Sequence, residues 1–144
     1  MSNHHHLFHS INQLSRQLTK RINEALQPFG LYSAQWSVLY TLHIKGTLTQ
    51  TELCEYLSVE APPMTRTIQR LMKQGYVKQI PCKDKRAKQI VLTDEAIAAF
   101  PEWEQAVLHT HQSLLNSLSG LSQTQLQMLL SDWLKDLMLE EERM

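Results

Sequence analysis

Apolar residues recur every three or four positions over Leu7–Leu26. This spacing places them on one stripe of a helix, and Pro28 and Gly30 are expected to end that helix. A helix this long and one-sided must bury its stripe on another surface. Because the chain is short, a second subunit is a good candidate, so the pattern predicts an N-terminal helix that takes part in a dimer interface.

Two shorter helices are expected next along the chain. The first covers Ala34–Ile44, and Ser33 is expected to cap its start. The second covers Gln50–Leu57. Thr49 and Glu52 stand three positions apart at its start, which is the capping-box spacing that satisfies free N–H groups at a helix N-terminus.

A third amphipathic helix follows after only three residues. It begins at Ala61 and is expected to stop at Gly75, since glycine tolerates the positive φ of a helix C-terminal cap. Its apolar face consists of Met64, Ile68, Leu71 and Met72. Two helices joined by so short a connection predict a helix-turn-helix. Two strands, Tyr76–Pro81 and Ala87–Leu92, then predict a hairpin with a short basic turn, which makes the winged form of that motif.

The C-terminal part of the chain predicts two further helices. Thr93 is expected to cap the first, which continues to about Leu118 with a kink caused by Pro101. Ser122 and Gln125 have the spacing of another capping box, and an apolar stripe of leucines follows them. These stripes are too many for one small core, which again favours a dimer.

Charge is distributed unevenly along a neutral chain. The sequence has 14 basic and 14 acidic residues, but eight basic residues and one acid lie between Arg66 and Lys88. From Asp94 to the end there are nine acids and two bases. Positive charge gathered on a helix and an adjacent hairpin is typical of a nucleic-acid binder. A solvated basic face is the alternative, and the helix-turn-helix pattern before it favours the first interpretation.

Several other classes of protein are disfavoured. A chain of 144 residues indicates one domain, or one domain with a helical extension. No apolar run approaches the roughly 20 residues of a membrane span, and the N-terminus does not have the pattern of a signal peptide. Two cysteines give no disulfide framework, so a cytoplasmic location is expected. We find no catalytic motif and expect no cofactor, and His4, His5 and His6 lack the ligand spacing of a metal site.

Several short motifs resemble one known family. They are Leu48-Thr49-Gln50-x-Glu52-Leu53, Thr65-Arg66, Leu71, Gly75-Tyr76-Val77, Asp84-x-Arg86 and Leu92-Thr93. Over essentially the whole chain the sequence is similar to the MarR family of bacterial transcription regulators. The resemblance implies a mainly α fold with a small β-hairpin wing. It places a winged helix-turn-helix lobe at residues 33–93, and dimerisation helices at residues 1–30 and 94–144. It further implies a homodimer that binds a near-palindromic operator, acts as a repressor and in some members responds to a small aromatic or anionic effector.

The residues expected to contact DNA lie on the third helix and the wing. They are Ala61, Pro63, Thr65, Arg66, Gln69, Arg70, Lys73, Lys83, Asp84, Lys85 and Arg86. Arg66, Gln69 and Arg70 suit guanine edges and phosphates in the major groove. By resemblance, Arg86 enters the minor groove, whose negative potential suits a planar cation, and Asp84 holds its guanidinium group.

The sequence also suggests an effector pocket and two alternative functions. The pocket would be lined by Trp36, Tyr40, His43, Trp103 and His109, although aromatic residues at helical spacing more often belong to the core. Cys82 has basic neighbours that favour a thiolate, so a redox-responsive regulator is one alternative. A winged-helix module for protein contacts is the other, and the concentration of basic residues argues against it.

Overall fold

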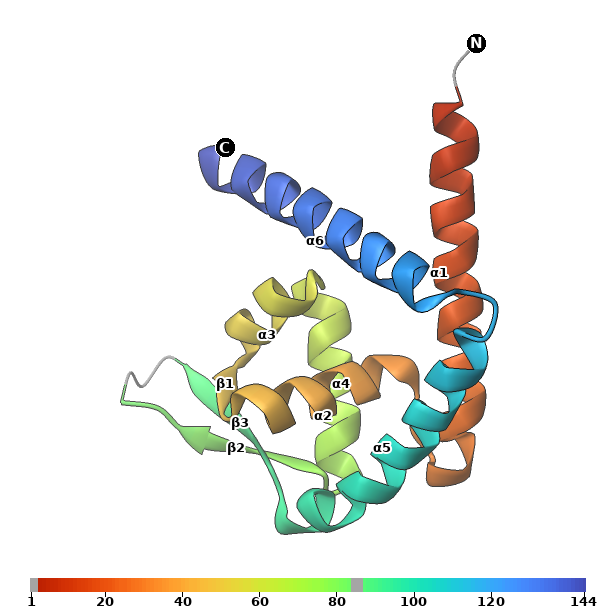
Figure 1. Ribbon diagram of the computed structural model, residues 1–144. Coiled ribbons are helices and arrows are strands. Elements are labelled where there is room, and N and C mark those ends of the chain that lie inside the picture. Colours follow the sequence, from red (N-terminus) through yellow and green to blue (C-terminus); the bar gives the residue numbers. More distant parts are fainter. Residues whose placement is uncertain (1–2, 84–86) are drawn as a thin grey trace. The chain divides into compact units, whose positions relative to one another are not determined.

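The computed structural model describes residues 3–83 and 87–144, and it is mainly helical with a small antiparallel sheet (Figure 1). Along the chain the elements are α1 (His4–Leu26), the 3-10 helix η1 (Gln27–Phe29), α2 (Ser33–Lys45), β1 (Leu48–Thr49), α3 (Gln50–Leu57), α4 (Ala61–Lys73), β2 (Val77–Pro81), β3 (Lys88–Leu92), α5 (Asp94–Leu114) and α6 (Gly120–Arg143). The predicted fold class is therefore confirmed.

The chain divides into two compact units, residues 1–107 and residues 108–144. The first unit contains α1, the helix-turn-helix, the sheet and most of α5, and the second contains the end of α5 and α6. The division into a DNA-binding lobe at 33–93 and a dimerisation lobe built from both ends of the chain stays a prediction.

The sheet has three strands in the order β1-β3-β2, all antiparallel. The predicted hairpin is present, with Gln79 opposite Ile90. Sequence reasoning missed β1, which pairs Leu48 with Ile90 and Thr49 with Gln89. The short β1 ends where α3 begins, so the sheet connects the base of the wing to the start of the helix-turn-helix.

One hydrophobic core holds the helix-turn-helix unit together. Its fully buried residues include Leu39 of α2, Leu53 of α3, Leu71 of α4, Ile90 of β3 and Ala96 of α5. Each of these elements thus contributes at least one side chain that water does not reach. Removing such apolar surface from water is the main stabilising contribution to the fold.

The predicted N-terminal cap of α3 is confirmed, and the predicted cap of α2 is wrong. The Thr49 hydroxyl accepts from the backbone N of Glu52 at 3.2 Å, and the Glu52 carboxylate accepts from the backbone N of Thr49 at 2.9 Å, so this capping box is confirmed. Ser33 was expected to cap α2, but it is the first residue of that helix. Its backbone N donates instead to Oδ1 of Asn23 at 2.7 Å, and a cap supplied from ten positions away leaves no local sequence pattern.

The C-terminal helices also differ from the prediction at their ends. α5 ends at Leu114 instead of about Leu118, with Pro101 inside it. α6 begins at Gly120, and its cap is Ser119 instead of Ser122. The reason is that Ser119 has extended backbone and its hydroxyl accepts from the backbone N of Ser122 at 3.1 Å.

Two long helices expose their apolar stripes. On α1, Leu14 is 54% exposed and Leu18 is 40% exposed. α6 has 24 residues and none of them is buried. Within the described residues, no helix is both long and apolar enough to cross a membrane.

Candidate nucleic-acid interface

α4 buries one face in the core and leaves the opposite face to solvent. Met64, Ile68 and Leu71 are at most 2% exposed. Met72 was expected on this face but is 39% exposed, because it follows Leu71 by only one position and projects past the edge of the buried stripe. The apolar contacts therefore fix which side of α4 meets solvent.

The solvent face of α4 carries the residues expected to contact DNA. Those that are exposed are Ala61, Pro63, Arg66, Gln69, Arg70 and Lys73. On the wing, Lys78, Lys83 and Lys88 are exposed as well. The described basic residues between Arg66 and Lys88 thus all reach solvent, and they form a positive surface on α4 and the hairpin.

Thr65 is the member of the predicted set whose hydroxyl is already engaged. It is half-buried, donates to the carbonyl of Ala61 at 2.9 Å and accepts from Nε2 of Gln50 at 2.7 Å. The bond from Gln50 joins the first residue of α3 to α4 and so helps to set the angle within the helix-turn-helix. Sequence reasoning named Gln50 only as part of a motif and missed this hydrogen bond, whose partner lies 15 positions away.

A shallow polar hollow lies where the wing meets the start of α3. Its volume is about 310 Å³, and its walls are Thr49, Gln50, Thr51, Gln79, Ala87, Lys88 and Ile90. The N-terminus of a helix carries partial positive charge and favours anions. The carboxylate of Glu52 already caps the start of α3, and Lys88 is the one basic side chain among the described residues that line this hollow.

Asp84, Lys85 and Arg86 lie outside the described residues. The wing-tip prediction that rests on them, an arginine in the minor groove oriented by an aspartate, therefore stays a prediction. Among the described residues, the last pair of the β2–β3 ladder is Pro81 opposite Lys88.

Three of the five residues suggested for an effector pocket, Trp36, Tyr40 and His43, lie in one aromatic cluster. Trp36 and His43 both stack on Phe100, with ring centroids 5.2 and 3.9 Å away. Trp36 also stacks on Tyr40, whereas Trp103 is 2% exposed and packs edge-on against Tyr76. His109 belongs to the second unit, residues 108–144. The aromatic side chains of the first unit thus make core contacts, and their assignment to an effector pocket stays a prediction.

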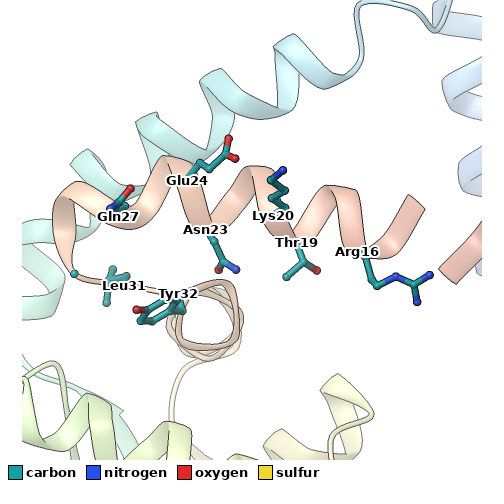
Figure 2. A pocket seen from close by; sticks show the side chains of 9 residues that line it. Arg16, Thr19, Lys20, Asn23, Glu24, Gln27, Leu31 and Tyr32 are labelled. Carbon is teal, nitrogen blue, oxygen red and sulfur yellow. The ribbon is translucent and has the colours of Figure 1, made fainter. Parts of the chain in front are cut away.

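A different hollow, of about 510 Å³, opens along α1 (Figure 2). It is lined by Arg16, Thr19, Lys20, Asn23, Glu24, Gln27, Gly30, Leu31 and Tyr32. In Figure 2, Thr19 and Asn23 project from the edge of α1 on the side of the Tyr32 ring, and Lys20 and Glu24 project from the opposite edge in this view. The hollow combines cations, amides, one carboxylate and one aromatic ring.

Neither cysteine forms a disulfide. Cys54 and Cys82 are both half-buried and free. Among the described residues, no group of three or more His, Cys, Asp or Glu side chains forms a metal site. The redox alternative through Cys82 stays untested.

Comparison with known proteins decides the family. A family model described as the MarR family matches residues 29–87. The uncharacterized HTH-type transcriptional regulator YwoH of Bacillus subtilis is 50% identical over 110 residues, which are 76% of this chain and 80% of YwoH. The multiple antibiotic resistance protein MarR of Escherichia coli is 33% identical over 116 residues, 79% of this chain and 78% of that protein. The chain belongs to the MarR family.

Solved structures of this family have the same fold. A crystal structure of a cysteine-to-serine mutant of MarR from E. coli, complexed with operator DNA, matches with a TM-score of 0.83 and 30% identity, over 89% of this chain and 93% of that one. A MarR transcriptional regulator from Methanosarcina mazei matches with a TM-score of 0.79 at 22% identity, over 90% of this chain and 88% of that one, and supports the fold alone. The resemblance drawn from the sequence motifs is thereby confirmed, and the family is one of transcriptional regulators.

Proposed function

We propose that this MarR-family chain is a sequence-specific DNA-binding repressor that reads a near-palindromic operator as a homodimer. The observation that carries the proposal is the solvent face of α4. There Arg66, Gln69 and Arg70 stand exposed on a helix whose other face is locked into the core. An α-helix of this kind fits the major groove, where each base pair has its own pattern of donors and acceptors. Such a regulator acts on the chromosome, so we also propose a cytoplasmic location.

Side-chain chemistry suggests which exposed residues contact bases and which contact phosphates. Arg66 and Arg70 suit guanine edges or phosphates, and Gln69 suits adenine. Lys73 and the wing lysines carry point charges that suit phosphates, which position the protein without reading sequence. Ala61 and Pro63 are exposed at the N-terminal end of α4, and their apolar side chains suit thymine methyl groups.

The exposed apolar stripes support the dimer. On α1 the stripe includes Leu7, Ile11, Leu14 and Leu18, and on α6 it includes Leu126, Leu129, Leu130, Leu134 and Leu137. Exposed apolar patches of this extent mark protein contact surfaces. A two-fold dimer would present two copies of α4, which matches a site whose two halves are related by the same symmetry.

Selection from a random-sequence duplex library tests the DNA-binding proposal. Wild-type protein should enrich one near-palindromic sequence. On that sequence Arg70→Ala should cost about 1–3 kcal/mol of binding free energy. The matched control is Arg143→Ala in the last turn of α6, which should leave affinity unchanged. Failure of the wild-type protein to enrich any sequence would contradict the proposal.

A specific observation favours regulation by a small organic anion as an addition to this function. The lining of the hollow along α1 includes two cations, Arg16 and Lys20, and the aromatic ring of Tyr32. A cation that binds a carboxylate and a ring that stacks on an aromatic ligand suit an aromatic acid. Glu24 also lines the hollow and disfavours ligands with several negative charges.

Calorimetry with benzoate and its neutral analogue benzamide tests the effector proposal. Benzoate should bind more tightly than benzamide, and Arg16→Gln should abolish the difference. Arg21→Gln is the matched control, because Arg21 is an exposed α1 arginine that does not line the hollow. Equal affinity for the two compounds would remove the case for an anion site.

A further inference from the structure

Three hydrogen bonds meet at two glutamine side chains in the first unit. Nε2 of Gln35 donates to Oε1 of Gln74 at 2.6 Å. Nε2 of Gln74 donates to the backbone carbonyl of Gly30 at 2.9 Å. Oε1 of Gln35 accepts from the backbone N of Tyr32 at 2.8 Å. Each amide oxygen faces a donor and the two amide nitrogens face acceptors, so both side chains have one consistent orientation.

The burial of Gln35 explains why its amide needs hydrogen-bond partners within the protein. Gln35 is 4% exposed, so in this arrangement its amide is satisfied by protein groups instead of bulk water. Buried polar groups without a hydrogen-bond partner are destabilising, and the arrangement therefore opposes any movement of Gln74 away from Gln35. The connector between α1 and α2 supplies the other acceptor through Gly30.

Gln74 stands at the C-terminal cap of α4, directly after the last basic turn. Its backbone N donates to the carbonyl of Arg70 at 3.0 Å, so its position is fixed to the helix. Arg70 and Lys73 line the same hollow, of about 360 Å³, as Gln35 and Gln74. These hydrogen bonds thus attach the C-terminal end of α4 to Gln35 of α2 and to Gly30. The attachment lies within one turn of Arg70 and Lys73.

Apolar contacts fix which face of α4 is buried, and directional hydrogen bonds from Gln50 to Thr65 and from Gln35 to Gln74 add control of its tilt. Hydrophobic packing is non-directional, whereas hydrogen bonds weaken steeply when their angles change. At about 1.5 Å per residue, Arg66 lies about 12 Å along α4 from Gln74, so a tilt of about 5° at the C-terminal end would displace Arg66 by about 1 Å. A displacement of that size is enough to break a bidentate contact between a side chain and a base.

We propose that Gln35 and Gln74 are positioning residues for operator recognition, which hold α4 in the orientation that reads bases without contacting DNA bases themselves. The inference rests on the proposed DNA-binding function. It predicts a selective effect: contacts to bases require the correct tilt of α4, whereas phosphate contacts by flexible lysines tolerate a small change. Removal of the glutamine pair should therefore reduce specificity and leave non-specific binding in place.

The test measures two affinities at one salt concentration, one for the duplex selected by the wild-type protein and one for an unrelated duplex. Gln74→Met keeps the length of the side chain and its lack of charge but removes the amide. It should lower affinity for the selected duplex roughly tenfold, the effect expected for one good base contact, and change affinity for the unrelated duplex less than about twofold. Gln74→Asn keeps the amide but is one methylene too short to reach both partners, and it should give the same pattern. Gln105→Met, at an exposed position of α5, is the matched control and should behave as wild type.

The outcomes separate the two proposals. If the wild-type protein does not discriminate between the duplexes, the DNA-binding proposal fails and this inference fails with it. If the wild-type protein discriminates and both Gln74 variants retain its specificity ratio, only the positioning role is overturned. Equal reductions on both duplexes would also overturn it, because a merely structural role reduces the amount of folded protein and lowers both affinities together. Thermal unfolding of each variant measures that structural contribution independently.

Discussion

The hydroxyl of Thr93 donates a 2.6 Å hydrogen bond to the backbone carbonyl of Gly75. The same hydroxyl accepts from the backbone N of Ala96 at 3.2 Å, so it also caps the start of α5. The backbone N of Thr93 donates to the carbonyl of Tyr76 at 3.1 Å. One residue therefore ties the turn after α4 to the start of α5, which gives a physical reason for threonine at this position.

The conformation of Gly75 leads to a stability prediction. Its φ is +83°, and a Cβ atom there would lie 3.1 Å from Oε2 of Glu95. Gly75→Ala should therefore lower the free energy of unfolding by about 1–3 kcal/mol, because the positive φ is strained for any residue with a side chain. Urea unfolding measures the change. Gly120→Ala is the control, since a Cβ atom there has no neighbour within 4 Å and φ is not positive, and it should be close to neutral. Equal stability of Gly75→Ala and wild type would show that this turn tolerates a side chain.

The exposed stripes predict the behaviour of charge substitutions in the dimer. Leu18→Glu and Leu130→Glu should each give monomers or unfolded chains, because a carboxylate cannot be buried in an apolar interface without a partner. Gln17→Glu and Gln125→Glu add the same charge at exposed polar positions of the same helices and should remain dimers. Analytical ultracentrifugation measures the mass. A stable wild-type monomer at micromolar concentration would contradict the dimer proposal.

At the wing tip, the direction in which a substitution changes operator affinity distinguishes two accounts. If Asp84 orients the guanidinium of Arg86, Asp84→Ala should weaken operator binding and resemble a milder Arg86→Ala. Simple electrostatics predicts the reverse, because the substitution removes a negative charge from a surface that meets phosphates. Operator affinity at fixed salt distinguishes the two, with Glu140→Ala in α6 as the control. Tighter binding by Asp84→Ala would mean that the wing acts only as a basic patch.

Local patterns in the sequence were enough to predict most elements of the fold. α3 was predicted with its correct bounds because its start signal, Thr49 and Glu52, lies within four residues. The end of α4 followed from Gly75, whose positive φ few other residues adopt. The exposed basic face of α4 followed from the helical spacing of its apolar residues. These features depend on neighbours in the chain, and short-range periodicity records them.

The features that were missed depend on partners far apart in the sequence. β1 has two residues and exists because β3 pairs with it about forty positions later. Gln35 and Gln74 are 39 positions apart, and nothing in either local sequence distinguishes them from the other glutamines of the chain. The hydrogen bond from the backbone N of Ser33 to the side chain of Asn23 likewise joins residues that are not neighbours in the chain. Such contacts are set by tertiary packing, so a single sequence gives no signal for them.

The salt dependence of operator binding tests the central claim, that the exposed basic residues of α4 and the wing bind duplex DNA, most directly. Each phosphate neutralised by a lysine or arginine releases condensed counterions, so the logarithm of the binding constant falls linearly with the logarithm of salt concentration. Between about 50 and 200 mM salt we expect a slope of about −3 or steeper, corresponding to at least three or four phosphate contacts per dimer. Lys73→Ala should make the slope shallower by about 1 for each phosphate that the variant no longer neutralises. A slope near zero for the wild-type protein would contradict the account.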